Sequence, residues 1–237
     1  GTGGLSVSDA SSGIAAGTLD VDTLDISTAN GAFSVSGGTV SITGDGVTVT
    51  DGQLAVSGGT LDNSIARQKT NLDGGTMTVT GGTTRLAQLL LTDGASYSQS
   101  AGAAEFNRIE IDGTSSAALS GSATVSPLFW STGITLDVDS GGSFSTNGQT
   151  VALGSAGVDG TFSQTGGAVT IGTLGGTGTY AMTGGTLNWN NGNLTGELDL
   201  NGSAATVNAS GLCSLDGATV TDPGSATFTI ASDSLAI

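Results

Sequence analysis

The sequence contains no histidine, one cysteine and two prolines among its 237 residues. Without histidine, Ser-His-Asp and Cys-His catalytic arrangements are excluded, as is every metal site that depends on an imidazole ligand. The one cysteine, Cys213, has no partner for a disulfide within the chain. It stands between Leu212 and Ser214 in an apolar stretch, which predicts a small buried thiol.

Basic residues are also scarce, with 4 Lys and Arg against 20 Asp and Glu, so the net charge is −16. A chain of this charge repels nucleic acid phosphates and anionic membrane surfaces, and neither is expected as a partner. No apolar run is long enough to cross a bilayer, and Gly1 to Ala10 lack the basic and apolar regions of a signal peptide. The sequence therefore predicts no direct insertion into a membrane.

What the chain has in abundance is glycine, 42 residues, and a repeat of eighteen residues between 142 and 207. A large apolar side chain follows two residues after each repeating glycine, and the same slot recurs in longer repeats nearer the N-terminus. A fixed period of this kind indicates a solenoid, in which equivalent positions of successive coils stack. The predicted core stack consists of Phe33, Leu54, Phe144, Phe162, Tyr180 and Leu198.

Alternation of apolar and polar residues within each repeat predicts three short strands per coil of about 18 to 21 residues, joined by Gly, Asn and Asp turns. The third strand is expected to carry Val158, Leu194 and Leu212. The fold class is therefore all-β: a parallel β-solenoid of about 12 coils, right-handed because parallel crossovers almost always are. We expect a single domain over residues 1–237, with irregular loops near 62–72 and 126–133, where the pattern breaks.

Two pairs of aspartates are candidates for chemistry, Asp20 with Asp22 and Asp137 with Asp139. Within each pair both carboxylates project from one strand face, where they are able to bind Ca²⁺ or share acid and base work in a polysaccharide-active β-helix enzyme. The alternative is a solvated acidic face, which we favour because a lyase also needs a basic residue nearby. The enzyme hypothesis therefore requires the coils from residues 85 to 108, which carry Arg85 and Arg108, to lie beside residue 137. No catalytic residue is assigned, and calcium is the one cofactor considered.

The segments GTFSQTGGAVTIG (160–172) and GTYAMTGGTLNWN (178–190) resemble the repeats of bacterial autotransporter passengers and PEP-CTERM-associated surface proteins. The resemblance is clear over residues 142–207 and weaker over 31–61 and 72–82. It implies an exported parallel β-helix, displayed at or released from the cell surface, with a structural or adhesive role. The family has no shared catalytic residues to transfer.

Our leading hypothesis is a non-enzymatic extracellular protein that forms filaments with its own copies by end-to-end stacking of solenoids. Solenoids that stay monomeric cover their terminal coils with polar caps, and neither end of this sequence shows one. The expected subunit contacts are Leu5, Val7, Phe228, Ile230, Leu235 and Ile237. The alternative is an adhesin that binds glycans or cell surfaces through an exposed ring at Trp130.

Overall fold

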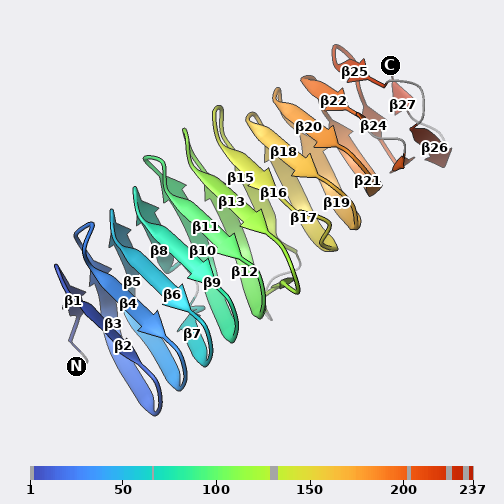
Figure 1. Cartoon of the computed structure of the whole chain (residues 1–237). Coiled ribbons are helices and arrows are strands. Elements are labelled where there is room, and N and C mark those ends of the chain that lie inside the picture. The colour runs from blue at the N-terminus through green and yellow to red at the C-terminus, as the bar shows by residue number, and fades with distance from the viewer. Residues whose placement is uncertain are drawn as a thin grey trace.

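The computed structural model describes residues 3–65, 67–128, 133–201, 204–222, 226–231 and 235–236. Every named element in these ranges is a β-strand, and the named strands pair with one another in parallel. Figure 1 shows the coils stacked one after another along a single axis. The parallel β-solenoid predicted from the repeat is thus confirmed. None of the described residues forms a helix that is able to span a lipid bilayer.

One strand from each coil joins a narrow sheet of eleven short strands, which carries the aromatic slot of the repeat. Its strands, in order, are β2 (Ser11–Ile14), β4 (Ala32–Val35), β6 (Gln53–Val56), β9 (Thr76–Val79), β11 (Ser96–Gln99), β13 (Ser116–Leu119), β16 (Ser143–Ser145), β18 (Thr161–Gln164), β20 (Thr179–Met182), β22 (Glu197–Asp199) and β25 (Thr219–Thr221).

The remaining strands form a wide sheet, in which the expected second and third strands of most coils run together as one long strand. In β10, the adjacent side chains of Leu86 and Ala87 are both buried, which marks a bend between the two halves. The strands are β1 (Leu5–Val7), β3 (Thr18–Ile26), β5 (Thr39–Thr50), β7 (Thr60–Asn63), β8 (Lys69–Asp73), β10 (Thr83–Thr92), β12 (Ala103–Ile111), β14 (Thr124–Pro127), β15 (Thr135–Val138), β17 (Val151–Val158), β19 (Ala168–Gly175), β21 (Gly185–Asn193), β23 (Ala205–Ser210), β24 (Cys213–Ser214), β26 (Thr227–Ala231) and β27 (Leu235–Ala236).

The stack makes about ten turns, fewer than expected, because several coils are longer than the eighteen-residue repeat. In the regular region Ser143 pairs with Thr161, and Thr161 with Thr179, each 18 residues further on. Ser116, in contrast, pairs with Ser143, which is 27 residues further along the chain. The hand of the coil stays a prediction.

Both irregular segments are shorter than the sequence suggested, and both lie at the bend of the wide sheet. β7 and β8 pair with β5 and β10 on either side, which leaves residues 64–68 opposite Ala87 of β10; of these, residue 66 lies outside the described residues. β14 and β15 both pair with β12, which leaves residues 128–134 opposite Asn107; of these, 129–132 lie outside the described residues. The flanking residues of each predicted loop are therefore strands.

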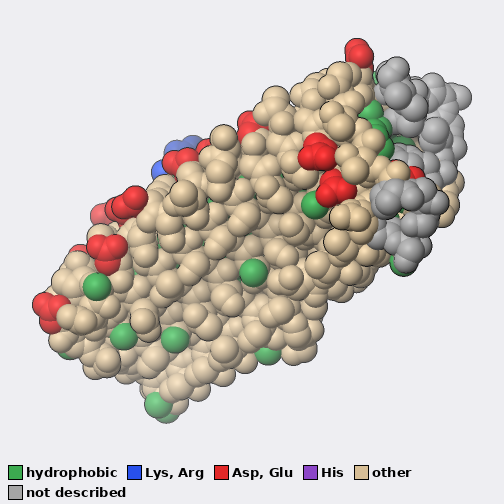
Figure 2. Space-filling model, turned by 45° about the horizontal axis from the view of Figure 1, so that its top comes forward, with side chains coloured by type: hydrophobic (Ala, Val, Ile, Leu, Met, Phe, Trp, Pro, Cys, Tyr) green, Lys and Arg blue, Asp and Glu red, His purple; other side chains and the backbone are tan. Residues whose placement is uncertain are grey.

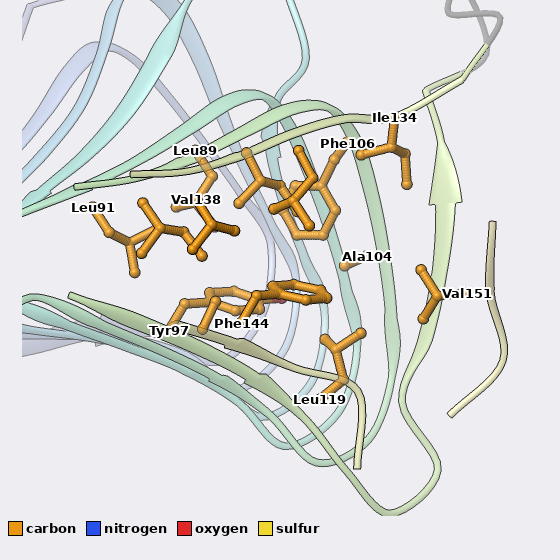
Figure 3. Packing of buried hydrophobic residues seen from close by; sticks show 14 of the residues in the cluster. Leu89, Leu91, Tyr97, Ala104, Phe106, Leu119, Ile134, Val138, Phe144 and Val151 are labelled. Atoms are coloured by element: carbon orange, nitrogen blue, oxygen red, sulfur yellow. The ribbon is translucent and has the colours of Figure 1, made fainter. Parts of the chain in front are cut away.

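The narrow sheet contributes a continuous buried column to the core. All six residues of the predicted core stack lie in it, each no more than 2% exposed, with Met77, Tyr97 and Ala117 between Leu54 and Phe144. The rings of Phe162 and Tyr180 are stacked, with centroids 4.5 Å apart. Figure 3 shows the narrow-sheet side chains facing Leu89 and Leu91 of the wide sheet across the core.

The expected third strand is right for Val158 and Leu194, which are buried, and wrong for Leu212, which is 73% exposed. The register pairs Gly192 of β21 with Cys213 of β24, and side chains alternate along a strand, so Leu212 points outward. Cys213 is buried, as predicted, and its thiol lies 3.2 Å from the carbonyl oxygen of Ser210. Burial raises the pKa of this thiol.

Hydrogen bonds join buried tyrosine and glutamine side chains in the core. The Tyr97 hydroxyl donates to Oε1 of Gln99 (3.1 Å), and the Tyr180 hydroxyl donates to Oε1 of Gln164 (2.9 Å). Both glutamines are buried two residues after the aromatic slot. Nε2 of Gln164 donates to the carbonyl oxygen of Thr186 in the next coil (3.0 Å), so these amides connect a turn to its neighbour.

Some glycines are required where backbones of adjacent coils approach each other closely. A Cβ at Gly196 would collide with the carbonyl oxygens of Gly178 and Thr177 in the preceding coil, and backbone atoms there cannot rotate away. Gly166 differs, because a Cβ there would lie at an ordinary contact distance, 3.6 Å, from Cα of Gly148. The two positions provide a test of the coil spacing.

We expect Gly196→Ala to destabilise the protein by about 1–3 kcal/mol through this overpacking. Gly166→Ala should change stability by no more than about 0.5 kcal/mol. Urea unfolding followed by far-UV circular dichroism measures both effects. Equal midpoints for the two variants would contradict the close approach at Gly196.

The two tyrosines of the chain, Tyr97 and Tyr180, are both buried, and burial raises the pKa of each phenol. Unfolded tyrosine ionises near pH 10. Because the folded state holds the neutral phenols, stability should be complete below about pH 10 and fall as the pH rises above it. Ultraviolet titration should show phenolate appearing only as the circular dichroism signal is lost, whereas urea-unfolded protein should titrate near pH 10. Phenolate formation in the intact fold near pH 10 would contradict the buried hydrogen-bonded state.

Candidate functional site

The outer face of the wide sheet brings Asp137 beside an arginine, a condition that the enzyme hypothesis required. Nη2 of Arg108 lies 2.8 Å from Oδ2 of Asp137, and its Nε lies 2.6 Å from Oε1 of Glu110. Glu110 and Asp137 are register partners on β12 and β15, so their carboxylates face outward on neighbouring coils. The coil of β12, which carries Arg108, does lie next to residue 137, whereas Arg85 on β10 is one coil further away.

This arrangement is better suited to holding coils together than to proton transfer. A guanidinium keeps its proton at any ordinary pH and so cannot act as a general base. In this cluster it already donates to two carboxylates, and the three side chains are between 34% and 44% exposed. Arg108 therefore neutralises two acidic residues that would otherwise repel each other from adjacent coils.

A second arginine makes the same kind of contact across three coils. Arg85 of β10 lies 3.2 Å from Glu105 of β12 and 3.7 Å from Asp62 of β7, and the register pairs it with both. Two of the four basic residues thus bridge carboxylates of neighbouring coils. The steps between partners on different coils vary from 20 to 29 residues, which the eighteen-residue repeat does not predict.

The four candidate calcium ligands do not come together. Asp20 and Asp22 lie on β3, far along the stack from Asp137 of β15, and Asp22 accepts a hydrogen bond from Oγ1 of Thr43 (3.1 Å). Asp139 is exposed just after β15. In the part of the chain that the structure describes, no three His, Cys, Asp or Glu side chains form a group suited to a metal ion. The calcium hypothesis gains no support from this geometry.

The predicted subunit contacts fall on the terminal coils, with different outcomes. Val7 is buried and Leu5 half-buried in β1, which pairs only with β3 among the named strands. Phe228 and Ile230 lie on β26, which pairs with β23, and Leu235 lies on β27. The structure does not describe the side chains of these three residues, and Ile237 lies outside the described residues. Trp130, the predicted glycan contact, also lies outside the described residues.

Sequence reasoning missed the outer face of the narrow sheet, where small uncharged side chains line up in two columns from β9 to β20. The first column is Thr76, Ser96, Ser116, Ser143, Thr161 and Thr179. The second is Thr78, Ser98, Ala118, Ser145, Ser163 and Ala181. We call these twelve positions the hydroxyl face. Their alignment depends on the register, so the residues look like ordinary strand and turn residues in the sequence.

No family model, no curated protein and no solved structure matches this chain. The likeness to autotransporter and PEP-CTERM repeats therefore rests on the repeated segments themselves. The features of the described residues that bear on function are the arginine bridges, the terminal coils and the hydroxyl face.

The role of Arg108 as a bridge between coils predicts a small, salt-dependent effect on stability. Arg108→Met should destabilise the fold by no more than about 1 kcal/mol at low salt, because the pair is partly solvated. About 1 M salt should reduce the difference, since it screens the repulsion between Glu110 and Asp137. Thermal unfolding of Arg108→Met and of Arg108→Met/Asp137→Asn measures it. If the second substitution does not recover stability at low salt, the bridge is not what Arg108 contributes.

Proposed function

We propose that this protein is a non-enzymatic structural protein of the bacterial cell surface that stacks end to end with its own copies to form a filament. The observation that carries the proposal is that the first and last strands of the narrow sheet each pair on one side only. Among the named strands, β2 pairs only with β4, and β25 only with β22. The exported, extracellular location is part of the proposal and is supported by the repeat resemblance.

The outer edge of β2 presents backbone groups with the right geometry for another strand. The carbonyl oxygens of Ala10 and Ile14 accept hydrogen bonds from the N–H groups of Ala32 (2.9 Å) and Ser36 (3.0 Å). Because the backbone groups of successive residues point to opposite sides of a strand, those of Ser11 and Gly13 point away from β4. An edge of this kind is a template for strand addition.

The two ends of the core column would face each other in an end-to-end contact. At one end Val220 stacks on Leu198 and is 40% exposed, and at the other end Ser12 stacks on Phe33. All strands run parallel, so the last coil of one copy meets the first coil of the next in the same orientation. Such a head-to-tail contact buries Val220 and repeats without closing unless the rotation forms a ring.

The two terminal strands themselves are uncharged, although the chain as a whole carries −16 and Asp9 and Asp222 stand close to them in the sequence. Neither Ser11–Ile14 nor Thr219–Thr221 contains a charged residue. The glycan-binding alternative has less support, because the aromatic side chains that the structure describes are buried. They are Phe33, Tyr97, Phe106, Phe144, Phe162, Tyr180 and Trp189. That alternative depends on Trp130.

We expect the protein to assemble in a concentration-dependent way, with filaments visible by negative-stain electron microscopy. Ser11→Pro should block assembly, because it removes an outward N–H without removing a bond to β4. Ser11→Ala keeps that N–H and should assemble like the parent. Light scattering across the micromolar range compares the three proteins. A parent that is monomeric throughout, or a Ser11→Pro variant that assembles equally well, would overturn the proposal.

A further inference from the structure

We propose that the hydroxyl face binds ice. Ten of its twelve side chains are Ser or Thr, and the other two are alanines, Ala118 and Ala181. All twelve are half-buried or exposed on the outside of the narrow sheet. The face is a separate surface from the terminal strands, so this proposal is independent of end-to-end stacking.

The spacing of these side chains is regular in two directions. Parallel strands place equivalent residues about 4.8 Å apart from coil to coil, and outward residues of one strand about 6.7 Å apart. Pairing from β9 to β20 proceeds without a register shift, even across the 27-residue step between Ser116 and Ser143. The step lengthens between Pro127 and Thr135, which pair with Phe106 and Arg108 of the wide sheet, so the array keeps its register.

The array is also rigid. Directly beneath it lies the buried column that includes Tyr97, Phe144, Phe162 and Tyr180, each no more than 2% exposed. Ser and Thr side chains are short and have few rotamers to lose on binding. A rigid lattice of weak hydrogen-bonding groups is preorganised for a partner that is itself a lattice, because many small contacts form at little entropic cost.

Charge and shape favour water over other ordered partners. The outward residues of the narrow sheet carry no charge from β2 to β20, and the first carboxylates, Glu197 and Asp199, lie on β22. Figure 2 shows a broad neutral face, with charged side chains along one edge and toward the C-terminal end. Exposed aromatic rings, on which sugar rings stack, are lacking on this face, so a crystalline polysaccharide is the poorer fit.

The proposal requires the two intervals of the array, which come from parallel strand geometry, to match repeats of the oxygen atoms on a face of hexagonal ice. Hydroxyl groups donate and accept, so they are able to take the place of water molecules in that lattice. The methyl groups of Thr and Ala lie among them, and removing apolar surface from water is favourable. Protein held on the crystal surface in this way restrains the growth of ice.

The test is an ice recrystallisation assay on the purified full chain, with Thr161→Lys as the disrupting variant. A long charged side chain at Thr161, on the fifth of the six strands of the face, should abolish inhibition at concentrations at which the parent stops grain growth. Thr173→Lys is the matched control, since Thr173 is exposed on β19 of the wide sheet in the same coil. Circular dichroism and thermal unfolding should show both variants folded.

The proposal is overturned if the parent restrains grain growth no more than a size-matched globular protein does. It is also overturned if Thr161→Lys and Thr173→Lys act alike, or if the parent binds microcrystalline cellulose or chitin but not ice. The Ser11→Pro variant separates this proposal from the filament. Inhibition of recrystallisation by a monomeric Ser11→Pro variant would support ice binding by the hydroxyl face independently of end-to-end stacking. Filaments of a parent protein that does not inhibit recrystallisation would support the structural role alone.

Discussion

The structure depends on one interaction, the parallel hydrogen bonding of each coil to the coils before and after it. Side chains alternate along every strand, so a slip of one residue between coils would exchange the core and solvent faces. The register therefore fixes the buried column from Phe33 to Leu198, the arginine bridges and the hydroxyl face at once. Each of these features is made of side chains at paired positions of successive coils.

This constraint explains where the chain accepts extra residues. The insertions at 64–68 and 128–134 each separate two paired strands of the wide sheet at its bend, and their described residues are 64, 65, 67, 68, 128, 133 and 134. Lengthening a surface loop costs little free energy, because closure entropy grows slowly with length. One extra residue inside a strand would instead shift every later side chain to the other face, whereas β5 keeps its faces because it has two more residues than β3 between Ile42 and Gly46. Length variation is tolerated at the bend because the register survives it.

The repeat made the fold and most of the core predictable, because apolar spacing reports directly on which side chains stack. The same reasoning failed where the coils depart from eighteen residues. Leu212 was assigned to the core because the third strand was aligned without knowledge of its register with Gly192. The Arg108–Asp137 contact spans 29 residues across the longest coil, so no fixed period predicts it. The hydroxyl face was missed for the same reason, since serine and threonine give no signal until their columns are aligned.

The distribution of charge links the two proposed surfaces. The four basic residues and the acidic residues paired with them lie on the wide sheet and its insertion, whereas the narrow sheet is neutral from β2 to β20. Molecules that carry −16 repel one another side by side, which disfavours pairing of one hydroxyl face with another. That repulsion acts least at the uncharged terminal strands. A chain built in this way can stack along its axis and still keep its neutral face open to water.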